Sequence, residues 1–185
     1  IPKKISFNSW ENNIVIILGI IEILGLKIKN LSKKIEKLTP IEGRGKINLI
    51  NFENRKIMLI DESYNSSPDS LKKSLENLLH YKKKNARIIC IIGDMLELGK
   101  NTEKMHIGIV DVLKKVNPDI VFTVGKFTLQ INKRMPESIR KFHFRSYKKV
   151  FDSLAKVIKN HDIVMVKGSN SSKVHVISKK LIESN

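Results

Sequence analysis

Short apolar runs alternate with helix-period segments over most of this chain. Runs that are rich in β-branched residues and bounded by polar residues or glycine are typical of buried strands. The pattern predicts strands at 47–52, 56–60, 87–92, 119–124 and 163–166, with a further short strand at 143–146. It predicts helices near 70–83, 102–116, 126–135, 147–160 and 171–182. Strands that alternate with helices favour an α/β domain with a mostly parallel sheet between two helical layers.

The first forty residues follow a different pattern. From Asn12 to Leu26 the apolar residues are so dense that most faces of a helix would have to be covered. A second short helix is expected from Leu31 to Leu38, closed by Pro40. The longest apolar stretch, Ile14 to Leu26, is shorter than the roughly 20 residues of a membrane span and contains Glu22, so it is interpreted as a core helix.

A polar loop follows the second predicted strand. The segment from Asp61 to Asn65 carries two carboxylates, a phenol and an amide. In an open α/β sheet such loops lie at the carboxyl ends of strands, where ligands bind. The same segment has a structural interpretation, in which Ser67 or Asp69 caps the next helix, Pro68 lies in its first turn, and the carboxylates are solvated.

The charge balance is strongly basic. Lys and Arg number 35 against 18 Asp and Glu, so the formal charge is +17. Such an excess is typical of proteins with a polyanionic partner. The lysines are nevertheless scattered, no zinc-finger spacing or RNP-like aromatic string is present, and only 6% of residues are aromatic. These features argue against nucleic-acid binding as the main role, although a basic surface could help to attract a polyphosphorylated substrate.

The single cysteine, Cys90, lies inside an apolar run and is expected to be buried. It cannot form an intrachain disulfide, which is consistent with a reducing cytoplasm. The chain starts at Ile1 rather than Met, and a helix begins almost at once, so a piece of a longer protein is expected. No phosphate-binding loop of the pattern G-x-x-x-x-G-K-[ST] occurs in it.

The polar loop resembles a family signature. Asp61-Glu62-Ser63-Tyr64-Asn65-x-x-Pro68-Asp69-Ser70 is similar to Asp-Asp-Ser-Tyr-Asn-Ala-Asn-Pro-Asp-Ser of the MurF type of Mur ligases. Further segments resemble motifs of the same family, in the family's order: Ser9-Trp10-Glu11-Asn12-Asn13, Glu42-Gly43-Arg44-Gly45-Lys46, Ile92 to Gly99 with His106 downstream, and Val166-Lys167-Gly168-Ser169.

The resemblance implies an ATP-dependent amide ligase that adds D-alanyl-D-alanine to UDP-N-acetylmuramoyl-tripeptide. Residues 1–42 would be the tail of its central ATP-binding domain, and residues 43–185 its Rossmann-like C-terminal domain. The tripeptide carboxylate would become an acyl phosphate that the dipeptide amine attacks. ATP and Mg²⁺ would be held mainly by the missing central domain, so this chain is expected to be inactive without the rest of the ligase in cis or trans.

The resemblance also implies roles for single residues. Asn13 would contact adenine, Arg44 the ATP phosphates, and Asp61, Tyr64 and Asn65 the ribose and adenine, while Lys167 and Ser169 would lie near the incoming dipeptide. No catalytic or metal-binding residue is expected in this chain, and no chemical step is assigned to His106.

Structural alternatives remain open for most of these residues. Asn13 would serve equally well as a helix cap, Arg44 as part of a simple turn, Lys167 as a surface lysine and Ser169 as a cap. Glu62 is close behind Asp61 as the nucleotide-facing carboxylate. At the level of function, the alternatives are a sister Mur or folyl-polyglutamate ligase and a non-catalytic basic binding module.

Overall fold

The computed structural model describes residues 8–26, 39–83 and 85–184, with side chains from Asn13 onward. The chain divides into two compact units, Ile1–Thr39 and Pro40–Asn185. In the first unit, helix α1 spans Asn8–Ile23, as predicted from the dense apolar stretch. The second predicted helix, at 31–38, lies outside the described residues.

The apolar faces of α1 are less covered than the sequence pattern suggests. Ile14 is buried, but Val15, Ile16 and Ile23 are 63%, 59% and 86% exposed. The expectation of a helix covered on most faces is therefore wrong for this chain.

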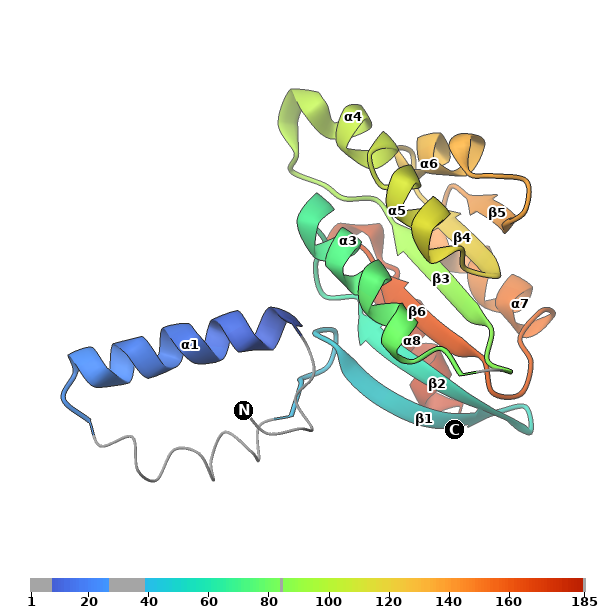
Figure 1. Ribbon diagram of the computed structural model, residues 1–185. Helices are drawn as coiled ribbons and strands as arrows, with labels where there is room; N and C mark the ends of the chain where they lie inside the picture. Colours follow the sequence, from blue (N-terminus) through green and yellow to red (C-terminus); the bar gives the residue numbers. More distant parts are fainter. Residues whose placement is uncertain (1–7, 27–38, 84, 185) are drawn as a thin grey trace. The chain divides into compact units, whose positions relative to one another are not determined.

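The described part of the second unit is built on a sheet of six strands in the order β1-β2-β6-β3-β4-β5 (Figure 1). The strands are β1 Lys46–Phe52, β2 Arg55–Glu62, β3 Ile88–Gly93, β4 Ile120–Val124, β5 Arg140–Phe144 and β6 Ile163–Lys167. Only the β1–β2 pair is antiparallel. The predicted α/β fold with a mostly parallel sheet is confirmed.

Helices cover both faces of this sheet (Figure 1). Side chains of α3, α5 and α6 pack on one face, and those of α7 and α8 pack on the other. The helices of this unit are α3 Pro68–Asn77, α4 Thr102–Ile107, α5 Val110–Val116, α6 Thr128–Arg134, α7 Val150–Ala155 and α8 His175–Glu183. The central strands β3, β4 and β6 are buried along their whole length, which explains why they appear in the sequence as continuous apolar runs.

Several elements differ in extent from their sequence-based prediction, and the helix expected at 147–160 is an α-helix only over Val150–Ala155. The single helix expected at 102–116 is two helices, which separate at Gly108, the weakest helix former in that segment. The strand expected at 143–146 instead spans Arg140–Phe144. Basic residues and a histidine interrupt the aromatic residues of this strand, so the sequence shows no continuous apolar run there. Pairing with β4 determines that the segment is a strand.

A tight hairpin joins β1 to β2, the strands expected at 47–52 and 56–60. Its turn residues Glu53 and Asn54 both have positive φ, 48° and 63°. Two successive residues in this conformation are the mark of a type I′ turn, whose twist matches that of the flanking strands. The hairpin therefore leads the chain directly into β2 and the polar loop that follows it.

A buried ion pair joins the starts of β3 and β6, at the end of the sheet opposite to the polar loops. Arg87 donates from Nε to Asp162 Oδ1 at 2.9 Å and from Nη2 to Asp162 Oδ2 at 2.7 Å. The Lys159 amide also donates to Asp162 Oδ2 at 2.7 Å. The hydrogen bonds that Arg87 donates to Asp162 raise the pKa of Arg87, so this cation stays charged at every physiological pH.

Removal of Asp162 should destabilise the second unit. Asp162→Ala leaves the Arg87 guanidinium with the Val157 carbonyl but without a counter-charge, and it leaves the Lys159 amide without its acceptor. We expect the free energy of unfolding to fall by about 3 kcal/mol. Chemical denaturation measures this change. The matched control Asp111→Ala removes an exposed carboxylate that pairs with Lys114 at 3.5 Å, and should change stability by less than about 0.5 kcal/mol. Equal effects of the two variants would contradict the assignment.

The edge strand β5 should make stability depend on pH. Burial lowers the pKa of His143, while the Asp94 carboxylate partly opposes this shift and Arg145 adds to it. Because the folded state binds the proton less readily than the unfolded chain, stability is full above the ordinary histidine pKa of about 6.5 and is lost as the pH falls.

The test compares denaturation midpoints at neutral and mildly acidic pH. His143→Gln should lose less stability on acidification than the unaltered chain, whereas His80→Gln, which changes an exposed histidine, should behave like the unaltered chain. A His143→Gln variant with an unchanged pH dependence would show that His143 makes no such contribution.

Candidate functional site

The carboxyl ends of three parallel strands meet at one edge of the sheet. Strand β6 lies between β2 and β3, and Lys167 is the register partner of both Glu62 and Ile92. The order of the strands along the sheet reverses at this point, and open α/β sheets bind ligands at such a point. The motifs at 61–70, 92–99 and 166–169 are thereby brought together, and we call this region the carboxyl edge.

The loop after β2 ends in a capped helix. Ser67 Oγ accepts a hydrogen bond from the Ser70 amide at 3.3 Å, and Ser70 Oγ accepts one from the Ser67 amide at 2.9 Å. With Pro68 at the start of α3, this capping box fixes where the helix begins. The structural interpretation of Ser67 and Pro68 is confirmed, and Asp69 lies in the first turn rather than at the cap.

Asp61 is buried although it carries a charge, with 4% of its surface exposed. Its Oδ1 accepts hydrogen bonds from Ser63 Oγ at 2.6 Å and from the Ser63 amide at 3.3 Å. Its Oδ2 accepts one from the Gly43 amide at 2.8 Å. Three donors compensate for the lost hydration of the carboxylate, so its interpretation as a solvated strand-end charge is wrong.

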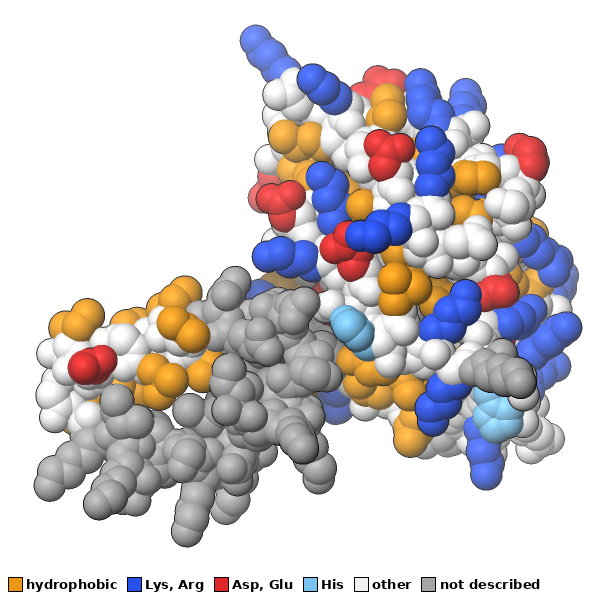
Figure 2. Space-filling model, in the orientation of Figure 1, with side chains coloured by type: hydrophobic (Ala, Val, Ile, Leu, Met, Phe, Trp, Pro, Cys, Tyr) orange, Lys and Arg blue, Asp and Glu red, His pale blue; other side chains and the backbone are white. Residues whose placement is uncertain are grey.

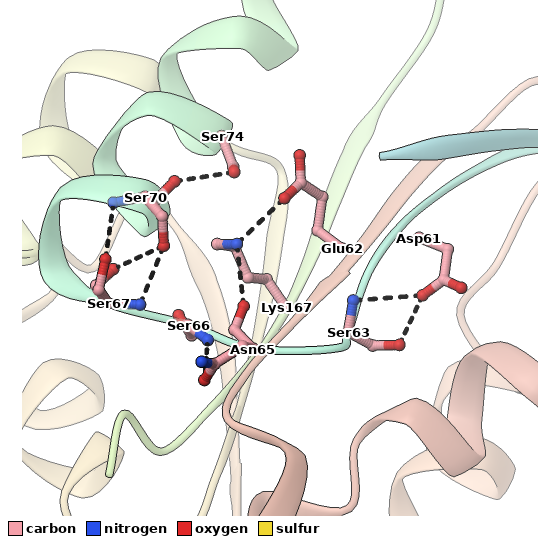
Figure 3. Close-up of polar contacts among 9 residues, drawn as sticks. All are labelled: Asp61, Glu62, Ser63, Asn65, Ser66, Ser67, Ser70, Ser74 and Lys167. Carbon is pink, nitrogen blue, oxygen red and sulfur yellow. Dashed lines mark hydrogen bonds and ion pairs between the residues drawn. The ribbon is translucent and has the colours of Figure 1, made fainter. Parts of the chain in front are cut away.

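Glu62 and Lys167 lie on the other side of β2 from Asp61 (Figure 3). Lys167 Nζ donates to Glu62 Oε2 at 3.0 Å and to the Asn65 carbonyl at 3.2 Å. The Lys167 side chain is only 3% exposed, so its alternative interpretation as a surface lysine is wrong. The ammonium instead holds the backbone of the loop at Asn65, whose own side chain accepts a hydrogen bond from the Ser66 amide at 2.8 Å.

The glycines around Arg44 place it beside Tyr64. Gly43 and Gly45 have φ of +73° and +91°, a backbone conformation that favours glycine. A Cβ on Gly43 would lie 2.8 Å from that of Tyr64, so no larger residue fits there. Arg44 Cζ lies 4.3 Å from the centroid of the Tyr64 ring, in a cation–π contact, and Tyr64 is 51% exposed. The arrangement offers a guanidinium and an aromatic ring side by side.

The loop after β3 is held by two side chains. Ser169 Oγ accepts a hydrogen bond from the Leu96 amide at 2.8 Å, and the Met95 amide donates to His106 Nε2 at 3.0 Å. His106 Nδ1 lies 2.7 Å from the Thr102 carbonyl, which can only accept, so the imidazole carries its single proton on Nδ1. The fully buried His106 is therefore a positioning residue for this loop.

Asp94 also has a structural task. Its carboxylate accepts hydrogen bonds from the amides of Lys126, Phe127 and Thr128 at 2.8, 3.0 and 2.8 Å. These amides open α6 and have no partners inside the helix. Asp94 therefore ties the end of β3 to the start of α6, and is not free to bind a ligand.

The ends of β3 and β6 approach each other too closely for side chains. A Cβ on Gly168 would lie 2.8 Å from Gly93 Cα and 2.7 Å from Ser172 Oγ. One on Gly93 would lie 2.5 Å from the same Ser172 Oγ. The two glycines thus fix the spacing of the loops that follow these strands.

A cavity of about 520 Å³ lies between Glu42, the loop after β2 and α8. Its lining contains the carboxylates of Glu42, Asp61 and Glu183 but only one lysine, Lys179, so it is locally acidic in a basic chain. A donor-rich, uncharged group such as a ribose suits these carboxylates better than a phosphate does. His175 also lines the cavity, and its buried Nδ1 has no hydrogen-bond partner among the described residues.

The lining residues from α8 had no signal in the sequence. They follow Asp61 by more than a hundred positions, and no local motif marks them. A larger apolar cavity of about 620 Å³, lined by residues such as Leu49, Met58 and Ile163, contains none of the predicted site residues. Asn13 is exposed on α1, in the separate first unit.

Other chemistry has little support in the described part of the chain. No group of three or more His, Cys, Asp or Glu side chains there could hold a metal ion. Burial raises the pKa of the Cys90 thiol well above its ordinary value, so Cys90 is not a nucleophile. Lysines and arginines are spread between acidic and apolar side chains over the face shown in Figure 2. None of the described helices has the length and apolar content to cross a membrane.

Sequence comparison finds curated relatives that share the name of one ligase activity. The UDP-N-acetylmuramoyl-tripeptide--D-alanyl-D-alanine ligase of Rickettsia prowazekii is 32% identical over 91% of this chain, and that of Bacillus subtilis is 32% identical over 69%. This chain spans 36% of the length of the first and 28% of the second.

Structure comparison agrees on the fold. The MurF ligase of Thermotoga maritima, solved in complex with ADP, superposes with a TM-score of 0.72 over 90% of this chain at 20% identity. This chain covers 36% of that structure. The family pattern of the Mur ligase, glutamate ligase domain matches residues 47–170, which include β2, β3, β6 and the loops of the carboxyl edge. The chain therefore belongs to the Mur ligase family.

Proposed function

We propose that this chain is the C-terminal part of an ATP-dependent ligase that joins D-alanyl-D-alanine to UDP-N-acetylmuramoyl-tripeptide. The relatives at 32% identity carry the name of that activity, and they extend well beyond the matched region. The observation that carries the proposal is the meeting of Arg44, Tyr64 and Asp61 beside an acidic cavity at the carboxyl edge. These residues come from two motifs that the sequence shares with the family.

The residues at this edge suit a nucleotide. Arg44 would contact the phosphates, because a guanidinium can make paired hydrogen bonds with phosphate oxygens. Tyr64, Asn65 and Asp61 would face the adenine and ribose, and Asp61 Oδ2 accepts only one hydrogen bond within the described chain, which leaves room for a ribose hydroxyl. Asn13 would contact the adenine. When bound, ATP supplies the phosphoryl group that activates the tripeptide carboxylate.

Lys167 and Ser169 are proposed contacts for the dipeptide. Both already have partners in the chain, since Lys167 binds Glu62 and Ser169 accepts the Leu96 amide. A dipeptide carboxylate would therefore compete with Glu62 for the Lys167 ammonium. The competition would make Lys167 available only when an anionic group arrives at this edge.

The remaining parts of the reaction are assigned to the rest of the ligase. We propose that it provides the phosphate-binding loop and the Mg²⁺ ligands, in the cytoplasm, where the buried thiol of Cys90 stays reduced. The chain alone should then hydrolyse no ATP. Turnover by the purified chain, measured as phosphate release, would refute this division of labour.

The site assignment can be tested in a chimera. This chain would replace the matching segment of the Rickettsia prowazekii ligase, and ADP release would be followed with UDP-N-acetylmuramoyl-tripeptide and D-alanyl-D-alanine. Arg44→Ala should lower kcat/KM by about 10- to 100-fold, because a charge-assisted contact to the phosphates is lost. Tyr64→Ala should mainly raise the KM for ATP.

The control Arg145→Ala removes an exposed arginine next to β5 and should leave kcat/KM unchanged. An Arg44→Ala chimera with full activity would contradict the phosphate assignment. The same assay with single amino acids in place of the dipeptide separates the proposed activity from that of a sister ligase, since a preference for another acceptor would favour the latter.

A further inference from the structure

The segment Gly43–Gly45 is bound along its length to the end of β2. The Gly43 amide donates to Asp61 Oδ2 at 2.8 Å, and the Gly45 amide donates to the Asp61 carbonyl at 2.7 Å. The Tyr64 amide returns a hydrogen bond to the Gly43 carbonyl at 3.0 Å. A segment joined at both ends in this way moves with the strand and is not a free hinge.

The Asp61 side chain is the charged member of this set. Two donors from Ser63 hold Oδ1, which orients the carboxylate so that Oδ2 meets the Gly43 amide. Because Asp61 is 4% exposed, water cannot readily replace these partners. The Gly43 amide therefore depends on one buried, pre-oriented carboxylate oxygen.

Arg44 lies between the two fixed glycines. Its guanidinium has no ion pair among the described residues and rests on the Tyr64 ring at 4.3 Å. Its position is therefore set by the backbone on either side and by Tyr64, whose amide belongs to the same hydrogen-bonded set. A change at Asp61 would therefore affect the position of Arg44 through the Gly43–Gly45 backbone and through Tyr64.

We propose that Asp61 is a positioning residue that fixes Arg44 at the carboxyl edge, so that the arginine moves as part of the second unit. The assignment of phosphate as the ligand of Arg44 rests on the proposed function. The positioning of Arg44 by the hydrogen bonds of Asp61 does not. A residue that only faced the ribose would leave the Gly43–Gly45 backbone unaffected when altered. The two roles therefore predict different results for the same substitution.

The first experiment measures amide hydrogen exchange in the purified chain, with and without Asp61→Asn. The asparagine has one acceptor oxygen for donors on two sides, so either Gly43 or Ser63 must face its NH₂ group. We expect the Gly43 and Gly45 amides to exchange at least about tenfold faster. The amides of β3 report global stability in the same data and should not change.

Two further variants sharpen this measurement. Asp111→Asn removes an exposed carboxylate far along the chain and should leave Gly43 and Gly45 unchanged. Ser63→Ala keeps the Gly43 contact and removes only one donor to Oδ1, so its effect on Gly43 should be smaller than that of Asp61→Asn. Unchanged exchange at Gly43 in Asp61→Asn would overturn the proposal.

The second experiment measures binding of inorganic tripolyphosphate to the chain. If Asp61 were only a nearby negative charge, its neutralisation would strengthen the binding of an anion. As a positioning residue it should do the opposite, and we expect Asp61→Asn to weaken binding by about three- to tenfold. In an Arg44→Ala background the same substitution should have no weakening effect, because the residue that it positions is gone.

The outcomes separate the two levels of inference. Stronger or equal binding by Asp61→Asn, with Arg44→Ala weaker than the unaltered chain, overturns the positioning role and leaves the phosphate assignment in place. Unchanged binding by Arg44→Ala overturns the phosphate assignment. The hydrogen exchange of the Gly43 and Gly45 amides then tests by itself whether Asp61 positions this segment.

Discussion

The pairing of β6 with β2 on one side and β3 on the other is the constraint on which the carboxyl edge depends. The strand that is last in the sequence enters the middle of the sheet, so it brings Lys167 between two loops that are about thirty residues apart in the chain. The motifs at 61–70 and 92–99 follow strands that are not neighbours, and β6 brings them to one edge by pairing with both. The strand order therefore determines which side chains can meet at this site.

The fold could be predicted largely from the sequence, because the central strands are buried on both faces and appear as uninterrupted apolar runs. Strand β5 was misplaced because it is a partly exposed edge strand whose basic residues interrupt its apolar pattern. The break between α4 and α5 escaped the pattern because apolar spacing continues through it, while the backbone turns at Gly108.

The candidate site was predicted less completely, for a physical reason. Motif resemblance located Arg44, Asp61, Tyr64 and Lys167, but it could not show that Asp61 and Lys167 are both buried. Nor could it show that their partners are Gly43 and Glu62, because such pairing arises only when distant segments fold together. The α8 residues that line the acidic cavity were missed for the same reason.

Asp61 and Lys167 act on opposite sides of one loop. The carboxylate holds Gly43 on the α8 side, and the ammonium holds the Asn65 carbonyl on the α3 side. Adjacent residues of a strand point to opposite faces, so the neighbouring acids Asp61 and Glu62 serve different contacts. The two acids are adjacent in the sequence, but the pleat of β2 gives them different partners and therefore different roles.

The contact between Gly93 and Gly168 has a consequence for inherited variation. Neither glycine has a side chain that could touch a substrate. A methyl group at Gly168 would nevertheless meet Gly93 Cα, and one at Gly93 would meet Ser172 and Val174 in the segment after β6. The loops that follow β3 and β6 would be displaced together. A survey of natural variants would then find these two positions as intolerant as any residue that binds a ligand, although their contribution is only the distance between two backbones.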